Sequence, residues 1–184
     1  MPVFESAAMI PPQTRREALT EVRAQLDTVS GSILNIRVGG NDLSHAFGLR
    51  RPANRTIYDL RPVADILIDI VAAFGTQYVV SGPVWEYYSG EGWEEGLRRE
   101  MELDLLNGFT GKTVIHPNQI PVVNEMLRVS QQDYADARAI LNWDTGSCSL
   151  VSASEDGGRM NEYNTHSRWA RRIVLRAERY GVRA

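Results

Sequence analysis

Short apolar runs alternate along the chain with longer stretches in which apolar residues recur every three or four positions. The runs are Pro2–Phe4, Ile33–Val38, Tyr78–Ser81 and Thr113–Ile115. The spaced sets are Ala18, Leu19, Val22, Leu26 and Val29; then Val63, Leu67, Ile70, Val71 and Phe74; then Leu97, Met101 and Leu105. Runs of the first kind predict buried strands, and sets of the second kind predict amphipathic helices. The alternation predicts an α/β fold with about four parallel strands, flanking helices and right-handed crossovers.

The chain beyond the fourth run predicts further helices and a loop. Ser130 and Asp133 resemble a capping box that opens a helix extending to Leu141. Residues 144–158 are rich in Ser, Gly, Asp and Thr, which predicts a flexible loop. A last amphipathic helix ends at Gly181. We therefore expect a domain of residues 1–143, followed by a loop and a C-terminal helix over residues 144–184.

Composition and charge narrow the classes of partner. The formal net charge of −3 argues against a nucleic-acid partner, because phosphate binding needs a basic surplus. An arginine cluster near the C-terminus is more typical of a solvated helix face than of a binding patch. No apolar run reaches the roughly 18 residues of a membrane span. Cys148 is the only cysteine, so no internal disulfide is expected and we assign it no catalytic role. These features together predict a cytoplasmic protein.

Polar residues that could take part in binding or catalysis stand where each predicted strand ends. Glu5 follows the first run, residues 39–42 the second, residues 81–86 the third, and His116 the fourth. In parallel α/β proteins ligands bind at the carboxyl ends of the strands. The sequence therefore predicts one site to which these four segments contribute.

Two of these residues, Glu5 and Asp42, are candidate metal ligands. Mg²⁺ prefers hard oxygen ligands and keeps several waters, so two carboxylates on neighbouring strand ends suit it. The alternative is that each carboxylate only caps a helix N-terminus.

Gly39 and Gly40 let the backbone approach a ligand, and N–H groups near Asn41 and Asp42 could bind a carboxylate. A tight strand-to-helix turn would use the same glycines. His116 is a candidate general acid or base, although a His-Pro pair at a strand end is also typical of a structural turn.

A specific resemblance enters at residues 108–120, which read Gly-Phe-Thr-Gly-Lys-Thr-Val-Ile-His-Pro-Asn-Gln-Ile. This segment resembles the last barrel strand of the citrate lyase beta-chain and malyl-CoA lyase superfamily, with its pattern G-x-x-G-K-x-x-I-H-P-x-Q. Residues 2–7 resemble the family strand that ends in a metal-binding Glu, and residues 39–43 resemble the strand end whose Asp is the second ligand. The sequence Gly-Gly-Asn-Asp-Leu at residues 39–43 is similar to that of a divergent branch of the superfamily, whose members are encoded with tellurite-resistance and stress-response genes.

The resemblance implies the C-terminal half of a (β/α)₈ TIM-type barrel, followed by C-terminal helices. It implies a Mg²⁺-dependent carbon–carbon bond lyase acting on a small carboxylic acid or an acyl-CoA-like substrate, with Glu5 and Asp42 as metal ligands. Backbone groups at Gly40, Asn41 and Asp42, together with His116, would bind substrate. Glu162, in Met160-Asn161-Glu162, would take the place of a catalytic Asp that the family presents from its C-terminal segment.

Half a barrel leaves open sheet edges and an apolar face, which need covering. We expect either an N-terminal barrel half or further copies in a homo-oligomer to cover them. The alternative function is a non-catalytic fragment or a binding and assembly protein that retains the metal or ligand site.

Overall fold

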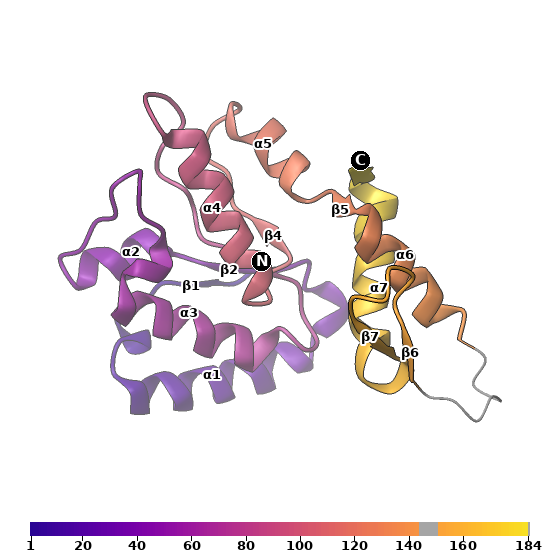
Figure 1. Ribbon diagram of the computed structural model, residues 1–184. Helices are drawn as coiled ribbons and strands as arrows, with labels where there is room; N and C mark the ends of the chain where they lie inside the picture. Colours follow the sequence, from indigo (N-terminus) through magenta and orange to yellow (C-terminus); the bar gives the residue numbers. More distant parts are fainter. Residues whose placement is uncertain (144–150, 184) are drawn as a thin grey trace. The chain divides into compact units, whose positions relative to one another are not determined.

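The computed structural model describes residues 1–143 and 151–183, which form two compact units, Met1–Met126 and Leu127–Ala184 (Figure 1). The units divide earlier than the boundary expected after residue 143. The reason is that helix α6 (Gln131–Leu141) packs against α7 (Tyr163–Tyr180) and so belongs with the C-terminal segment. Cys148 and residues 144–150 of the expected loop lie outside the described residues.

The first unit is built on a parallel sheet in the order β1 (Val3–Phe4), β2 (Ile36–Val38), β3 (Val80–Gly82), β4 (Gly111–Lys112). Each strand pairs in parallel with the next one along the chain. Helices follow the strands, as α1 (Pro12–Asp27), α2 (Gly40–Ala46), α3 (Arg61–Phe74), α4 (Trp93–Leu106) and α5 (Gln119–Met126). Sequential parallel strands separated by helices are the arrangement of a TIM-type barrel, and the sheet supplies four such strands.

The fourth strand lies earlier than the apolar run Thr113–Ile115 that predicted it. Thr113 still donates its backbone N–H to Gly82 O at 3.1 Å, but Val114 and Ile115 beyond it are exposed. The inward place in β4 is taken by Lys112, whose side chain is fully buried against acidic residues of α4. The buried strand position that the apolar pattern predicted for residues 113–115 is therefore occupied by the paired charge of Lys112.

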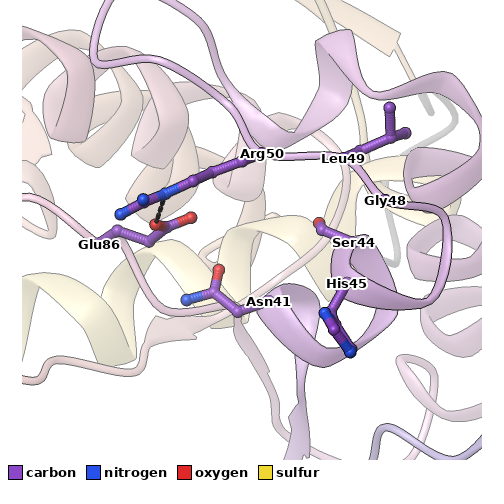
Figure 2. A pocket seen from close by; sticks show the side chains of 7 residues that line it. All are labelled: Asn41, Ser44, His45, Gly48, Leu49, Arg50 and Glu86. Atoms are coloured by element: carbon purple, nitrogen blue, oxygen red, sulfur yellow. Dashed lines mark hydrogen bonds and ion pairs between the residues drawn. The ribbon is translucent and has the colours of Figure 1, made fainter.

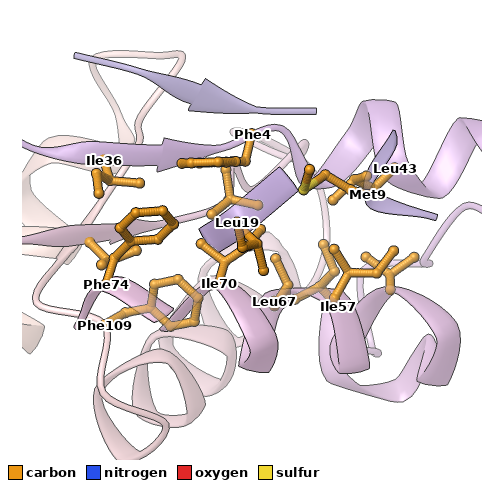
Figure 3. Packing of buried hydrophobic residues seen from close by; sticks show 14 of the residues in the cluster. Phe4, Met9, Leu19, Ile36, Leu43, Ile57, Leu67, Ile70, Phe74 and Phe109 are labelled. Carbon is orange, nitrogen blue, oxygen red and sulfur yellow. The ribbon is translucent and has the colours of Figure 1, made fainter. Parts of the chain in front are cut away.

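The main core lies between the sheet and helices α1 and α3 (Figure 3). Phe4 and Ile36 from the sheet meet Leu67, Ile70 and Phe74 from α3, and the Phe4 and Phe74 rings are 5.0 Å apart. Each such side chain contributes about 1.5–3 kcal/mol when removed from water. This burial holds the strand ends, and the site at them, in fixed positions.

The opposite face of the sheet carries the polar Arg37 beside the exposed Val3 of β1, so it is mixed where an apolar face was expected. Arg37 alternates with the buried Ile36 and Val38, so it points away from the helices. Its Nε donates to Thr113 Oγ1 at 3.3 Å, linking β2 to the end of β4.

In the second unit, α6 and α7 pack around a small core of Val129, Ala137, Ile140, Ala170, Ile173 and Ala177. The cap expected at Ser130 is present, since its Oγ accepts the backbone N–H of Asp133 at 3.1 Å. The positive φ of Gly181, 83°, closes α7 at the residue predicted.

Short strands complete the second unit. Strands β5 (Val129–Ser130) and β8 (Val182–Arg183) pair in parallel, and β6 (Val151–Ala153) and β7 (Met160–Glu162) form an antiparallel hairpin. The described part of the expected flexible loop is thus this hairpin. Within the described residues, no helix is both long enough and apolar enough to cross a bilayer.

Candidate active site at the carboxyl ends of the strands

Glu5 and Asp42 approach each other around Gly39. Glu5 directly follows β1, Asp42 lies in the first turn of α2, and the Gly39 N–H donates to Phe4 O at 3.0 Å. A methyl group on Gly39 would lie 2.6 Å from Oε2 of Glu5 and 3.1 Å from Oδ2 of Asp42. The two carboxylate oxygens can therefore be no farther apart than the sum of these distances.

This donor set fits a Mg²⁺ ion. Oxygen ligands bind Mg²⁺ at about 2.0–2.1 Å, which places two ligands in adjacent positions about 3 Å apart. Both residues are exposed, and a rotation of their side chains would be needed to place an oxygen of each on one ion. Among the described residues no group of three or more His, Cys, Asp or Glu side chains is placed to hold a metal. One or two carboxylates plus water or substrate oxygens are usual for Mg²⁺ in enzymes.

The first turn of α2 is held tightly beneath Asp42. A Cβ on Gly40 would lie 2.6 Å from both Ile57 and Pro83, so only glycine fits there without displacing them. Ser44 donates from Oγ to Gly40 O at 2.7 Å, and Leu43 N donates to Gly39 O at 3.0 Å. The turn expected from the paired glycines is therefore also a close-packed contact.

The Asn41 side chain turns toward a buried arginine. Its Oδ1 accepts a hydrogen bond from Nη1 of Arg51 at 3.2 Å. Arg51 is 1% exposed, and its guanidinium also donates to Val84 O and pairs with Glu100 (Nε to Oε2, 2.9 Å). The guanidinium carbon lies 5.1 Å from the centre of the Trp85 ring, within the range of a cation–π contact.

Glu100 and Asp104 of α4 bind a second cation, Lys112. Lys112 Nζ lies 2.8 Å from Glu100 Oε1 and 2.7 Å from Asp104 Oδ2. The Tyr58 hydroxyl donates to Asp104 at 2.7 Å, and burial next to that carboxylate raises the pKa of Tyr58. Burial also raises the pKa of Asp104, against the opposing effect of Lys112. Lys112 thus supports β4 from the helix side.

The His-Pro-x-Gln segment joins two loops at the same end of the sheet. Gln119 is fully buried, donates to Trp85 O and Tyr87 O at 2.9 Å each, and accepts the Ile115 N–H at 3.0 Å. The His116 ring stacks on Tyr88 with centroids 4.3 Å apart. Its Nδ1 accepts the Asn118 N–H at 3.2 Å, and Nε2 has no hydrogen-bond partner in the described part of the chain.

An open pocket of about 400 Å³ lies beside α2 (Figure 2). It is bounded by Asn41, Ser44 and His45 on the helix, residues 48–50 after it, and Glu86 from the β3–α4 loop. Arg50 donates to Glu86 at 2.9 Å across it, and this contact raises the pKa of Arg50. Of the four strand-end segments, the second and the third thus supply residues to this pocket, through Asn41 and Glu86.

Glu162 belongs to the C-terminal unit, at the junction of β7 and α7. Its carboxylate accepts from the Thr165 hydroxyl at 3.3 Å, and its N–H donates to His166 Nδ1 at 3.0 Å. His166 lies in the first turn of α7.

Sequence reasoning missed the buried charges Arg51, Glu100 and Asp104. Arg51 stands in the Gly-Leu-Arg-Arg-Pro segment, and Glu100 lies in a run of charged residues on α4. Glu100 and Asp104 stand four positions apart on one helix face with Leu97 and Met101, which are buried. That spacing was the available signal.

Comparison with known proteins places these features in context. The family model described as C–C bond lyase of the TIM-barrel fold matches residues 1–182. The L-malyl-CoA/beta-methylmalyl-CoA lyase of Cereibacter sphaeroides is 38% identical over 74 residues, covering 39% of this chain and 22% of that protein.

A solved structure is also similar. The CitE protein of Mycobacterium tuberculosis, crystallised with magnesium, acetoacetate and coenzyme A, matches 79% of this chain and 52% of its own chain. The TM-score is 0.59 and the sequence identity is 25%. The chain thus spans about half the length of this solved relative and about a fifth of the curated one.

Proposed function

The chain belongs to the family of C–C bond lyases of the TIM-barrel fold, and from that premise we propose that it provides the Mg²⁺-binding part of a lyase active site. The reaction proposed is an aldol-type cleavage or condensation of a 2-hydroxy or 2-keto acid, or of an acyl-CoA-like substrate. The observation that carries the proposal is the approach of the Glu5 and Asp42 carboxylates around Gly39.

Glu5 and Asp42 are the proposed metal ligands, one from a strand end and one from a helix start. When bound there, Mg²⁺ would supply a Lewis acid for the charge that develops on a substrate oxygen as the C–C bond breaks or forms. The similar CitE structure contains magnesium, which supports this assignment for the family site.

The backbone of α2 is the proposed carboxylate-binding element. The first N–H groups of a helix have no acceptor within the helix and favour anions. Gly40, Asn41 and Asp42 occupy these positions. Their N–H groups would hold a substrate carboxylate next to the two acidic side chains, so that substrate oxygens face the metal ligands.

Two further residues are proposed to act on the substrate. His116 has Nε2 free, and stacking on Tyr88 fixes the plane of its ring, so it is suited to hydrogen-bond a substrate oxygen. Glu162 is the proposed acid from the C-terminal segment. In cleavage it would donate a proton to the substrate carbon that keeps the electrons of the broken C–C bond. In condensation it would accept a proton from that carbon.

The substrate class and partners follow from the relatives. The malyl-CoA lyase name and the coenzyme A and acetoacetate in the CitE crystals support an acyl-CoA-like or keto-acid substrate. The match to CitE covers 52% of the CitE chain, and the sheet described here has four parallel strands. We propose that an N-terminal barrel half or a second copy completes the barrel around it.

The proposal is tested by incubating the chain with Mg²⁺ and a panel of β-hydroxyacyl-CoA thioesters and free 2-hydroxy acids. The 2-keto acid released by cleavage is trapped with phenylhydrazine and measured. We expect Mg²⁺-dependent release that is lost in Glu5→Gln and Asp42→Asn. Glu17→Gln, which removes an exposed carboxylate on α1, is the matched control and should match the wild type.

The same panel separates the lyase from the binding alternative. A chain that binds Mg²⁺ and a keto acid but releases no product from any member of the panel, even when an N-terminal barrel half is supplied, would favour the non-catalytic binding protein. Release that is unchanged in Asp42→Asn would contradict the site proposed here.

A further inference from the structure

Arg51 links the first turn of α2, which carries the proposed metal ligand Asp42, to other segments at the same end of the sheet. Its guanidinium contacts three separate segments, through Asn41 on α2, Val84 after β3, and Glu100 on α4. Its side chain has no exposed surface. An arginine offers five N–H donors in a rigid planar fork, so it can hold several acceptors in fixed relative directions.

The far end of this connection is fixed by charge pairing. Glu100 receives Arg51 and Lys112, and its Oε2 also accepts the Ile57 N–H at 2.7 Å. Asp104 receives Lys112 and the Tyr58 hydroxyl. These two carboxylates are buried with both cations and fix the guanidinium from the α4 side, while Glu86 Oε1 lies 3.8 Å from Arg51 Nη1.

The near end of the connection is the residue immediately before Asp42. The Asn41 side chain accepts from Arg51, while Gly40 on its other side is packed against Ile57 and Pro83. Both residues that precede Asp42 are therefore held by contacts outside α2. Asp42 itself is exposed and faces Glu5 across Gly39, so its direction depends on how this turn is held.

From these contacts we infer that Arg51 is a positioning residue for the metal site, acting through Asn41. This inference rests on the proposed Mg²⁺ site and adds the element that sets its geometry. Arg51 does not touch the metal ligands in this arrangement. It holds the first turn of α2 where the Asp42 carboxylate meets that of Glu5.

The sign of the effect distinguishes positioning from electrostatics. A buried positive charge near a divalent cation opposes binding, so removing only its field would strengthen Mg²⁺ binding. Loss of positioning weakens it instead. Hydrogen-bond partners of metal ligands typically change metal affinity by about 10–100-fold when removed.

The test measures Mg²⁺ affinity by calorimetry in variants of Asn41 and Arg51. Asn41→Ala removes the acceptor and leaves the Arg51–Glu100 pair in place. Arg51→Lys keeps the charge beside Glu100 and loses the reach to Asn41. We expect each to lower Mg²⁺ affinity about tenfold, and we expect the double variant to lower it no further, because both changes break one connection.

Asn41→Asp keeps an acceptor for Arg51 and should bind Mg²⁺ at least as tightly as the wild type. Ala46→Gln, at an exposed position of the same helix, is the matched control and should leave affinity unchanged. Wild-type affinity in both Asn41→Ala and Arg51→Lys, or tighter binding in Arg51→Lys, would overturn the inference while the Mg²⁺ site itself stands.

A second measurement tests positioning without metal. Amide hydrogen exchange over residues 40–46 in the metal-free protein should speed up in Asn41→Ala and Arg51→Lys, but not in Ala46→Gln. If the wild type binds no Mg²⁺, the proposed function fails and this measurement alone decides the inference. Unchanged exchange in both Arg51-linked variants would overturn it.

Discussion

The carboxylates of Glu5 and Asp42 meet around a glycine that leaves just enough room for them. A side chain on Gly39 would lie 2.4 Å from Cβ of Glu5 and 2.6 Å from its Oε2. Glu5 and Asp42, which are far apart in the sequence, therefore both lie next to the space that a side chain at position 39 would fill.

Gly39→Ala is therefore expected to displace Glu5 and weaken Mg²⁺ binding by at least about tenfold. The φ of Gly39 is −83°, which alanine adopts freely, so the effect would be steric rather than backbone strain. Overpacking of this kind costs about 1–3 kcal/mol in stability. Calorimetry and thermal unfolding measure the two effects. Gly31→Ala, where no atom lies within 4 Å of the new methyl group, should change neither.

Glu100→Gln should destabilise the fold strongly, because Arg51 and Lys112 would share a neutral partner in a buried place. Breaking a buried ion pair typically costs about 3–5 kcal/mol. Urea unfolding at neutral pH measures the change. Glu102→Gln, an exposed position on the same helix, should stay within about 0.5 kcal/mol of the wild type. A loss below about 1 kcal/mol for Glu100→Gln would contradict the buried network.

Gln119→Ala should loosen the His-Pro-x-Gln segment from the β3–α4 loop. The substitution leaves the carbonyls of Trp85 and Tyr87 and the N–H of Ile115 without their partner. Each unsatisfied buried group costs about 1–3 kcal/mol, so we expect a loss of at least about 2 kcal/mol by urea unfolding. Asn124→Ala, exposed on α5, is the control. Equal stability of the two variants would contradict the role assigned to Gln119.

Asp59 makes a pH-dependent contribution to stability. The Thr56 backbone N–H donates to its carboxylate at 2.7 Å and lowers the pKa of Asp59, with smaller effects from the Thr56 hydroxyl and from Arg55. A pKa lowered in the folded state contributes stability above the unfolded value of about 3.9 and loses it as the pH falls through the folded value.

Asp59→Ala should accordingly cost about 0.5–1 kcal/mol at pH 7, the range of an exposed helix cap. The gap from the wild type should narrow as the pH is lowered below about 4. Unfolding by urea at a series of pH values measures it. A gap that stays constant across the series would assign the cost to something other than the carboxylate charge.

Much of the fold could be predicted from the sequence because its signals are local. The first three strands and helices α1, α3 and α4 lie over the apolar patterns that predicted them. The cap at Ser130 and the stop at Gly181 are read from single residues with a known local preference. The strand-end rule brought Glu5 and Asp42 to one place, since parallel strands end at a common edge.

The parts of the fold and site that the sequence did not predict depend on contacts between residues far apart in the chain. Arg51 and Glu100 lie far apart in sequence, and each alone reads as a solvated charge, because charged residues are rarely buried unless paired. The position of β4 followed from Lys112 pairing with Asp104 rather than from hydrophobicity. Strand β6 was read as part of a loop because it has three residues within a stretch rich in Ser, Gly and Asp.

The central claim is that Glu5 and Asp42 together bind Mg²⁺, and its most direct test is a Mg²⁺ titration by calorimetry in the presence of oxalate, a mimic of a keto-acid enolate. The wild type should bind, and binding should disappear in Asp42→Asn, while Glu17→Gln behaves as the wild type. Folded wild-type protein that binds no Mg²⁺, or an Asp42→Asn variant that binds as tightly, would contradict the account.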